Sequence, residues 1–272
     1  MVDNSVRNKV ICLAALALLM SGCSTDAAEP AAAGASSVSA QPHSGCSPRD
    51  GRPTEVPVRI KEPEQAPEPA AKPDPPDGVY GDPDAATRYW AEQSEGDCGL
   101  MATRTVIGEL TGQAPTERDI IDMAADTPSE CSPGEPVYDE SVDPTDGGVG
   151  HGTCTTDLML LLDQFGIESD YTNDDVAADG GVDTGMDALL DYLNDDRQVI
   201  VCVNSRIIWD TEGDRTNCGH LITVAAVDVP NDIVYLGDSG GADTRGEQVS
   251  MATFEQAWAT GDDVMLELAD DY

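Results

Sequence analysis

The chain has 272 residues, of which 40% are hydrophobic and 4% aromatic, and its 52 acidic residues against 14 basic ones give a formal net charge of -38. Such a charge repels phosphate backbones and anionic lipid headgroups, which excludes nucleic-acid binding. Twelve of the 18 prolines lie within residues 30–83, so the folded domain must be shorter than the chain.

The first 22 residues have the layout of a secretory signal peptide. Arg7 and Lys9 precede an apolar run, Val10–Met20, which a Ser-Gly pair and Cys23 follow. The run is about half the ~20 apolar residues that a membrane-spanning helix needs. A cysteine directly after Ser-Gly resembles the bacterial lipoprotein cleavage site. We therefore expect an extracytoplasmic protein that is anchored to the cell membrane by a diacylated Cys23. An ordinary signal peptide with an incidental cysteine is the alternative.

Residues 23–84 are rich in Pro, Ala and Glu. This composition favours polyproline extension, and it offers too little apolar surface to offset the entropy of folding. We interpret the segment as a disordered tether that holds the following domain away from the membrane. His43 and Cys46 are then passengers in the tether rather than ligands.

Residues 85–272 carry 40 acidic residues, seven Arg and no Lys, a net charge of -33. The charges are dispersed among apolar positions, which is typical of a solvated surface and not of an acidic tail. Solubility at high salt or a lineage bias of composition explains them most simply. An attraction for cationic substrates is the alternative.

Hydrophobic periodicity predicts helices in the first half of this domain. The first spans Cys98–Gly112, with Gly112 as its stop, and Thr116 with Asp119 resembles a capping box at the start of the second. A third begins at Thr155 or Thr156 and ends at Gly166, and a fourth contains Met186, Leu189, Leu190 and Leu193.

The second half changes to a pattern that is typical of strands separated by turns. The predicted strands are Val199–Val203, Leu221–Val229, Ile233–Leu236 and Val264–Leu268, and a short helix, Thr253–Thr260, precedes the last of them. Helices followed by an antiparallel sheet predict an α+β fold.

Cys98 is the best candidate for a nucleophile. It lies at a predicted helix N-terminus, where the helix dipole and the unpaired amides stabilise a thiolate. His220 opens one predicted strand and Asp238 closes the next, so Asp238 would orient the imidazole and fix its tautomer. Gln93, just upstream, would donate its amide to an oxyanion together with the Cys98 backbone amide.

Three segments carry a family resemblance: Q-x4-C-G from Gln93, G-H-L-I-T-V-A-A-V-D from Gly219, and V-Y-L-G-D-S-G from Val234. They resemble papain-fold cysteine peptidases of the bacteriocin-processing (double-glycine leader peptidase) type, over residues 88 to about 266. The resemblance implies a papain-like α+β fold with Cys98 as nucleophile, His220 as base, Asp238 as orienting residue and Gln93 as oxyanion donor. One departure is the glutamine, which the family usually places six residues before the cysteine and which here lies five before it.

Together with the lipoprotein-like signal, the resemblance predicts a surface-anchored cysteine peptidase, for which we expect neither a cofactor nor a metal. Its partners would be a peptide or protein substrate and, through the lipid anchor, the membrane, with no nucleic acid; we expect a monomer. The bacteriocin-processing enzymes act inside the cell and are fused to a transporter, so the substrate stays open. The alternatives are a catalytically silent binding module with the same fold and an amidase that acts on cell-wall peptides.

A serine peptidase is a competing hypothesis. Gly237–Gly241 spells the G-D-S-G-G nucleophile motif of trypsin-like enzymes, and Gly150–Thr153 is similar to the histidine motif of subtilisin-like ones. These two motifs belong to unrelated folds. A trypsin-like fold has two β-barrels before its catalytic serine, whereas helices are predicted in the corresponding part of this sequence. In the thiol scheme we expect the Ser239 hydroxyl only to face a turn.

A zinc site is a third hypothesis. Suitable ligand types for zinc are present at His151, Cys154, Cys218 and His220. The spacing of these residues along the chain is loose, however, and an oxidising compartment disfavours free thiolates. The carboxylate clusters at residues 143–146 and 174–175 lack the ligand spacing of a calcium loop, so we interpret them as solvated.

The cysteine count fits an oxidising compartment. Setting aside Cys12 in the signal, Cys23 and Cys98, five cysteines remain. The simplest arrangement is two disulfides, Cys131 with Cys154 and Cys202 with Cys218, and an unpaired Cys46 in the tether.

Overall fold

The computed structural model describes residues 72–141 and 152–268. Several parts of the sequence discussed above lie outside these ranges. They are the expected signal peptide, the predicted lipidation site Cys23, the tether residues His43 and Cys46, and His151. Among the helices of the described ranges, none combines the length and the apolar character needed to cross a membrane.

A seven-stranded sheet forms the centre of the domain, with strand order β2-β7-β3-β4-β5-β6, and β1 pairs with β4 as well. Each of these pairings is antiparallel. The strands are β1 Val79–Gly81, β2 Ser169–Thr172, β3 Gln198–Val203, β4 His220–Asp228, β5 Ile233–Gly237, β6 Glu247–Val249 and β7 Met265–Leu268.

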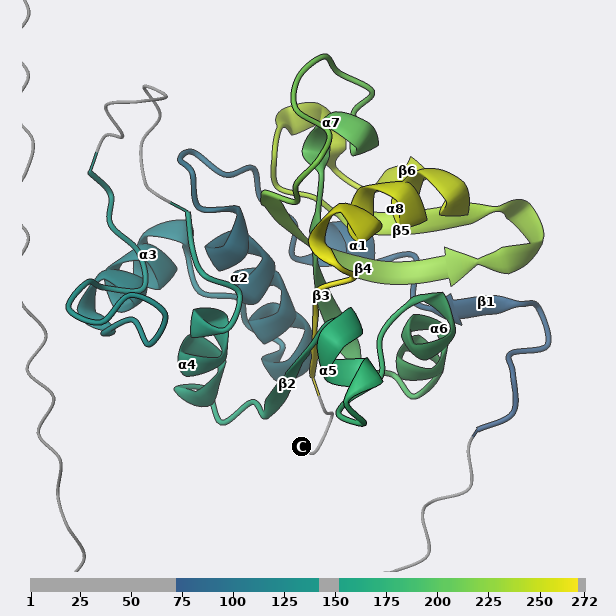
Figure 1. Ribbon diagram of the computed structural model, residues 1–272, viewed down its shortest axis with the longest axis horizontal. Helices are drawn as coiled ribbons and strands as arrows, with labels where there is room; N and C mark the ends of the chain where they lie inside the picture. Colours follow the sequence, from purple (N-terminus) through teal and green to yellow (C-terminus); the bar gives the residue numbers. More distant parts are fainter. Residues whose placement is uncertain (1–71, 142–151, 269–272) are drawn as a thin grey trace, which may run out of the picture. The chain divides into compact units, whose positions relative to one another are not determined.

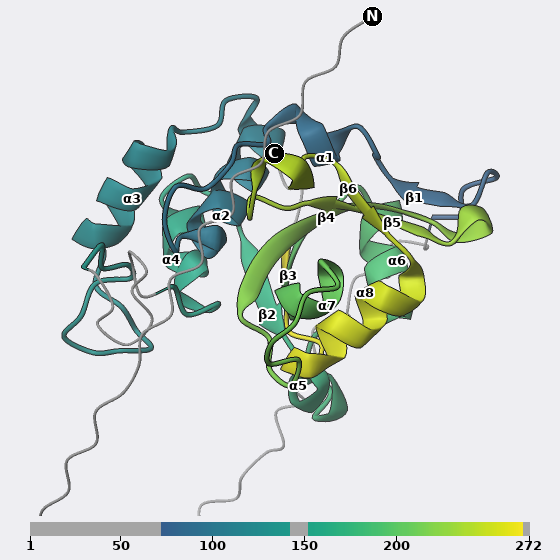
Figure 2. The ribbon, with the colours of Figure 1, turned by 90° about the horizontal axis from the view of Figure 1, so that it is seen from above.

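Helices cover the two faces of this sheet, as Figure 1 and Figure 2 show. One face carries α2, α3 and α4, and the other carries α6, α7 and α8. The helices are α1 Ala85–Arg88, α2 Cys98–Thr111, α3 Glu117–Asp126, α4 Asp157–Asp163, α5 Asp174–Ala178, α6 Met186–Asn194, α7 Ser205–Ile208 and α8 Met251–Trp258.

Strand β3 shows why both faces are covered. Its side chains alternate, so Ile200 and Cys202 join the core under α2 and α4 while Val199, Val201 and Val203 join the core under α6 and α8. All five side chains are buried. A strand that is apolar on both faces needs a helical layer on each side, and the resulting rigid centre positions the residues at the ends of β4 and β5.

The α+β layout predicted from the sequence is confirmed. Helix α2 begins at Cys98 and ends at Thr111, and the C-cap residue Gly112 follows with a φ of 77°, the left-handed conformation of a glycine cap. Helix α3 has the full capping box, in which Thr116 accepts from the backbone of Asp119 and the Asp119 side chain accepts from the backbone of Thr116.

Several short elements were not predicted, and one of them corrects the domain boundary. Strand β1 pairs with β4, with Val79 opposite Asp228, so the folded part begins before residue 79 and not at residue 85. The strand has three residues and lies in Pro- and Asp-rich sequence, so no alternation was visible. The other elements missed are α1, β2, α5, α7 and β6, each of three to five residues.

Candidate active site

Cys98 is the first residue of α2, a 14-residue helix, and it is the free cysteine of the described ranges. Its Sγ accepts a hydrogen bond from the backbone N–H of Leu221 at 3.5 Å. The next residue must be glycine, because a Cβ on Gly99 would lie 2.2 Å from Thr153 Oγ1 and 2.9 Å from Leu221 Cδ1. This close approach brings the start of α2 against β4.

His220 is the first residue of β4 and is buried. Its Nε2 lies 2.7 Å from Asp238 Oδ1. The other ring nitrogen, Nδ1, remains for the Cys98 thiol, and each of these two groups shifts the pKa of the other. The Trp209 ring packs beside the imidazole, with 5.2 Å between the ring centroids. The imidazole therefore bridges the thiol and the carboxylate.

The charged forms of Cys98, His220 and Asp238 stabilise one another. Burial opposes ionisation of the Cys98 thiol, but the hydrogen bond and charge of His220 outweigh it, so the pKa of Cys98 is lowered. Burial also opposes the charged imidazole, yet hydrogen bonds to Asp238 and Cys98 raise the pKa of His220 to about 10. The hydrogen bond to His220 likewise overcomes burial and lowers the pKa of Asp238. These shifts favour a thiolate and an imidazolium at neutral pH.

Asp238 is fully buried and directly follows β5. The β4–β5 register pairs Thr223 with Gly237, which brings the start of one strand to the end of the other. Besides His220, Asp238 Oδ1 accepts from Gly240 N at 2.7 Å and Oδ2 accepts from Trp209 Nε1 at 3.0 Å. A Cβ on Gly240 would lie 2.4 Å from the Trp209 ring, so a glycine is needed here.

Gln93 is tied to Ser239, the neighbour of Asp238. Its backbone N–H donates to Ser239 O at 2.9 Å, and its Oε1 accepts from Ser239 Oγ at 2.9 Å. Its Nε2 donates to the backbone oxygen of Glu95 at 2.8 Å. That oxygen only accepts, which fixes the amide orientation and makes Ser239 the donor to Oε1. The expectation that the Ser239 hydroxyl only faces a turn is therefore wrong.

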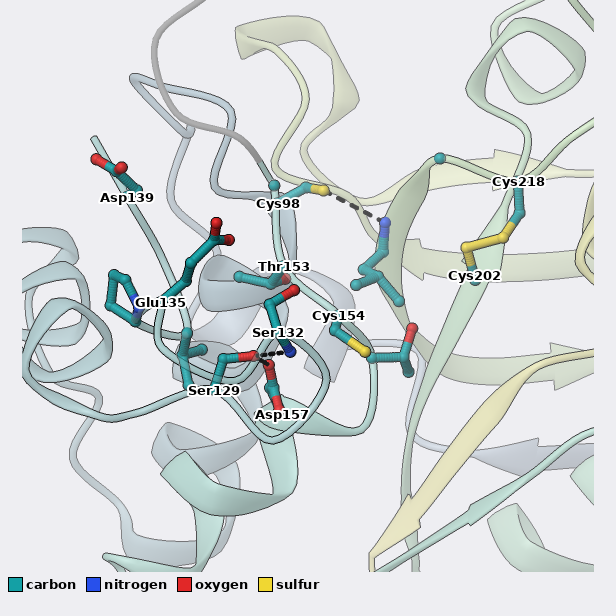
Figure 3. Close-up of a pocket in the computed structure, with 16 residues that line it drawn as sticks. Cys98, Ser129, Ser132, Glu135, Asp139, Thr153, Cys154, Asp157, Cys202 and Cys218 are labelled. Atoms are coloured by element: carbon teal, nitrogen blue, oxygen red, sulfur yellow. Dashed lines mark hydrogen bonds between the residues drawn. A yellow bond between two sulfur atoms is a disulfide. The ribbon is translucent and has the colours of Figure 1, made fainter. Parts of the chain in front are cut away.

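A cavity of about 600 Å³ lies beside Cys98. Figure 3 shows Cys98 on one side of it, near Thr153. Two exposed carboxyl groups, Glu135 and Asp139, also line it. The cavity provides room for a substrate next to the nucleophile.

Two disulfides flank this cavity, Cys131–Cys154 and Cys202–Cys218. They join the same residues as the pairs named from the sequence. Cys218 lies two residues before His220, so the second disulfide fixes the segment that enters β4. The first joins two segments that line the cavity.

The serine and zinc hypotheses find no support in the described part of the chain. Ser239 Oγ donates to an amide oxygen and not to an imidazole, and His220 is the one histidine in the described ranges. Cys154 and Cys218 are in disulfides, so neither offers a thiolate to a metal. A compact group of Cys131, Cys154 and Asp157 contains both sulfurs of the Cys131–Cys154 disulfide, so it offers no thiolate either.

Two residues beside Asp238 had no role assigned from the sequence. Trp209, which follows α7, holds the carboxylate through its indole N–H. Glu247 begins β6, and its carboxyl group and that of Asp238 shift the pKa of each other. The notable position of Trp209, before the histidine, belongs to the family resemblance, but no short motif marks Glu247, which reaches the site from a part of the chain that lies close only after folding.

No family model matches the chain. The chain is similar to several solved structures and to several proteins of related sequence. A chain described as a C39-like peptidase from Bacillus anthracis is 14% identical, covers 71% of this chain and 98% of its own length, and has a TM-score of 0.46. The peptidase domain of Streptococcus ComA, a bi-functional ABC transporter, is 15% identical, with coverages of 67% and 98% and a TM-score of 0.39. Roles for residues here therefore have to come from the geometry of this site.

The sequence relatives are more similar. Uncharacterized protein Rv1268c of Mycobacterium tuberculosis (strain ATCC 25618 / H37Rv) is 42% identical over 193 residues, which are 69% of this chain and 83% of that protein. Uncharacterized protein Mb1299c of Mycobacterium bovis (strain ATCC BAA-935 / AF2122/97) matches with the same identity and coverage. The chain belongs to the family of these mycobacterial proteins.

Proposed function

We propose that the protein is a thiol hydrolase, a papain-like cysteine peptidase that cleaves peptide amide bonds. The single observation that carries the proposal is the series Cys98–His220–Asp238, in which His220 Nε2 lies 2.7 Å from Asp238 Oδ1 and His220 lowers the pKa of Cys98. A nucleophile, a base and a group that orients the base are the parts that covalent catalysis of acyl transfer needs.

The reaction begins from the Cys98 thiolate and the His220 imidazolium, whose Nδ1 holds the proton that the thiol has lost. The thiolate attacks the amide carbon and forms a C–S bond, and the carbonyl oxygen becomes an oxyanion. The Cys98 backbone N–H and Gln93 Nε2, which keeps one N–H beyond its bond to Glu95, are the donors proposed for that oxygen. His220 then protonates the leaving amine as the C–N bond breaks.

The thioester that remains is hydrolysed in the second half of the reaction. His220 takes a proton from water, the resulting hydroxide attacks the thioester carbon, and the Cys98 thiolate leaves. Asp238 keeps Nε2 protonated throughout, so that Nδ1 is the nitrogen that exchanges protons. Burial of Asp238 removes competition from water for that hydrogen bond.

The proposal includes attachment to the outer face of a bacterial membrane through a diacylated Cys23. It rests on the signal-like segment and the Ser-Gly-Cys sequence, which lie outside the described residues. Two acyl chains give the stable anchoring that one chain does not. The substrates would then be peptides or proteins of the cell envelope.

Hydrolysis of a peptide library, followed by mass spectrometry, tests the peptidase proposal. We expect cleavage by the wild type, and loss of cleavage to an equal extent in Cys98→Ala and His220→Ala because members of one catalytic unit fail together. Asp238→Ala should reduce turnover substantially. Near-ultraviolet circular dichroism verifies that each variant folds.

Two outcomes would contradict the proposal. Activity that survives Cys98→Ala but not Ser239→Ala would make serine the nucleophile. A wild type that cleaves nothing while it folds normally would favour the silent binding module.

A further inference from the structure

Asp238 has more polar neighbours than an orienting carboxylate needs. Its two oxygens already accept from His220, Gly240 and Trp209. A fourth polar group, the carboxyl group of Glu247, acts on the same residue, and each of these two carboxyl groups shifts the pKa of the other. The mechanism proposed above does not use Glu247.

Strand pairing explains how Glu247 reaches the site. The β5–β6 register pairs Glu247 with Leu236, two residues before Asp238. Leu236 is fully buried, and β6 lies at the edge of the sheet order beside β5. The site therefore contains two carboxyl groups from neighbouring strands.

These two carboxyl groups cannot both be ionised at low energy. Glu247 Oε2 is completely buried and has no hydrogen-bond partner among the described residues, and the Trp209 indole has only a smaller effect on this carboxyl group than Asp238 has. An ionised carboxylate only accepts hydrogen bonds, so a contact between two carboxyl groups requires a proton on one of them. Asp238 has three donors and the imidazolium charge, which makes it the anion. The proton belongs on Glu247.

We infer that Glu247 is a positioning residue that remains protonated and donates its carboxyl O–H to Asp238, so that it holds the carboxylate that orients His220. This inference rests on the proposed function, because it gives Glu247 a purpose only where His220 serves Cys98. The series then extends over four residues, from Cys98 through His220 and Asp238 to Glu247.

The groups that act on Glu247 agree with this assignment. Burial and the charge and hydrogen bond of Asp238 raise the pKa of Glu247 to about 8, against smaller opposite effects of the Trp209 indole and the His220 charge. Glu247 is therefore mostly protonated at pH 7. Above pH 8 it ionises, and a second negative charge faces Asp238 without a donor between them.

Linkage gives the sign of the effect on stability. In the unfolded chain Glu247 has an ordinary pKa of about 4.3, so between pH 5 and 8 the folded state binds more protons than the unfolded state. This difference makes the Glu247 contribution to stability fall as the pH rises. Glu247→Gln keeps a hydrogen-bond donor and cannot ionise, so it removes that slope.

The experiment uses the full chain as wild type, Glu247→Gln and Glu247→Leu. Two matched controls are Glu255→Gln on the exposed side of α8 and Gln248→Leu on the exposed side of β6. The first measurement is the urea midpoint at pH 5, 6, 7, 8 and 9. We expect the midpoint of Glu247→Gln to exceed that of the wild type by an amount that grows from pH 5 to 8, with no such growth for Glu255→Gln.

The second measurement is the rate of Cys98 alkylation by iodoacetamide at pH 7, mapped by mass spectrometry. The Cys98 alkylation rate of Glu247→Gln should stay within about twofold of the wild-type rate. The rate of Glu247→Leu should be lower by about fivefold or more, because this variant loses roughly one hydrogen bond. If Glu247→Leu fails to fold, the Glu247→Gln results decide the question.

A midpoint difference that does not change with pH would overturn the inference, as would a Glu247→Gln variant that is as slow as Glu247→Leu. The peptidase proposal and the inference on Glu247 can be contradicted independently of each other. An unreactive Cys98 in a wild type that shows the expected midpoint trend contradicts the peptidase proposal and supports the proton on Glu247. A reactive Cys98 without the trend contradicts only the role of Glu247.

Discussion

At the scale of single residues, the serine of the G-D-S-G-G sequence has a role unlike the one its motif suggests. Its hydroxyl holds Gln93 Oε1, and the adjacent glycine makes room for the Trp209 ring against Asp238. The motif is therefore explained by the packing around the Asp238 carboxylate. Ser239 positions the amide proposed to bind the oxyanion.

This role gives a prediction for Ser239→Ala. Loss of one hydrogen bond to Gln93 should lower kcat/KM for a cleaved peptide by roughly fivefold, or ~1 kcal/mol, without loss of Cys98 reactivity. In a Gln93→Ala background the same substitution should have no further effect, because both act on one donor. An additional fivefold loss in that background would contradict the pairing.

The sequence predicted some of these residues and not others for a physical reason. Cys98, His220 and Asp238 could be named as candidates because a helix start and two strand ends are visible as local patterns. The hydroxyl of Ser239 and the carboxyl of Glu247 gain their meaning only from contacts across the sheet. Such contacts depend on strand register, which local patterns do not specify.

At the scale of elements, the helices that the sequence predicted are those with long periodic runs and end signals. Helix α3 has both a capping box and a buried face that contains Ile120 and Ile121. Short elements such as α7 and β6 have too few residues for a period to emerge. Tertiary packing holds them in place, so their positions could not be predicted from the sequence alone.

The capping box of α3 predicts the effect of Thr116→Ala. The substitution removes the acceptor for the Asp119 backbone N–H and should lower the free energy of unfolding by ~1 kcal/mol in urea titrations. Thr156→Ala is a matched control, because Thr156 is the N-cap residue of α4 but makes no side-chain cap hydrogen bond. Equal losses in the two variants would contradict the capping account.

At the scale of the whole molecule, the sheet joins parts of the chain that are far apart in sequence. Helix α2 supplies Cys98 from one face, and the ends of β4 and β5 supply His220 and Asp238. The two disulfides then fix the segments around the cavity. The α+β layout was predictable because its parts are sequential, whereas the early start of the domain at β1 was hidden by the surrounding prolines.

The central claim is that His220 keeps Cys98 ionised, and the pH dependence of Cys98 alkylation tests it most directly. In the native wild type, the iodoacetamide rate at Cys98 should fall by clearly less than tenfold per pH unit from pH 8 to 6, because His220 lowers the pKa of the thiol. In His220→Ala the rate should fall about tenfold per pH unit over that range, as for an ordinary thiol with a pKa of about 8.5. A wild-type rate that falls as steeply as that of His220→Ala would contradict the account.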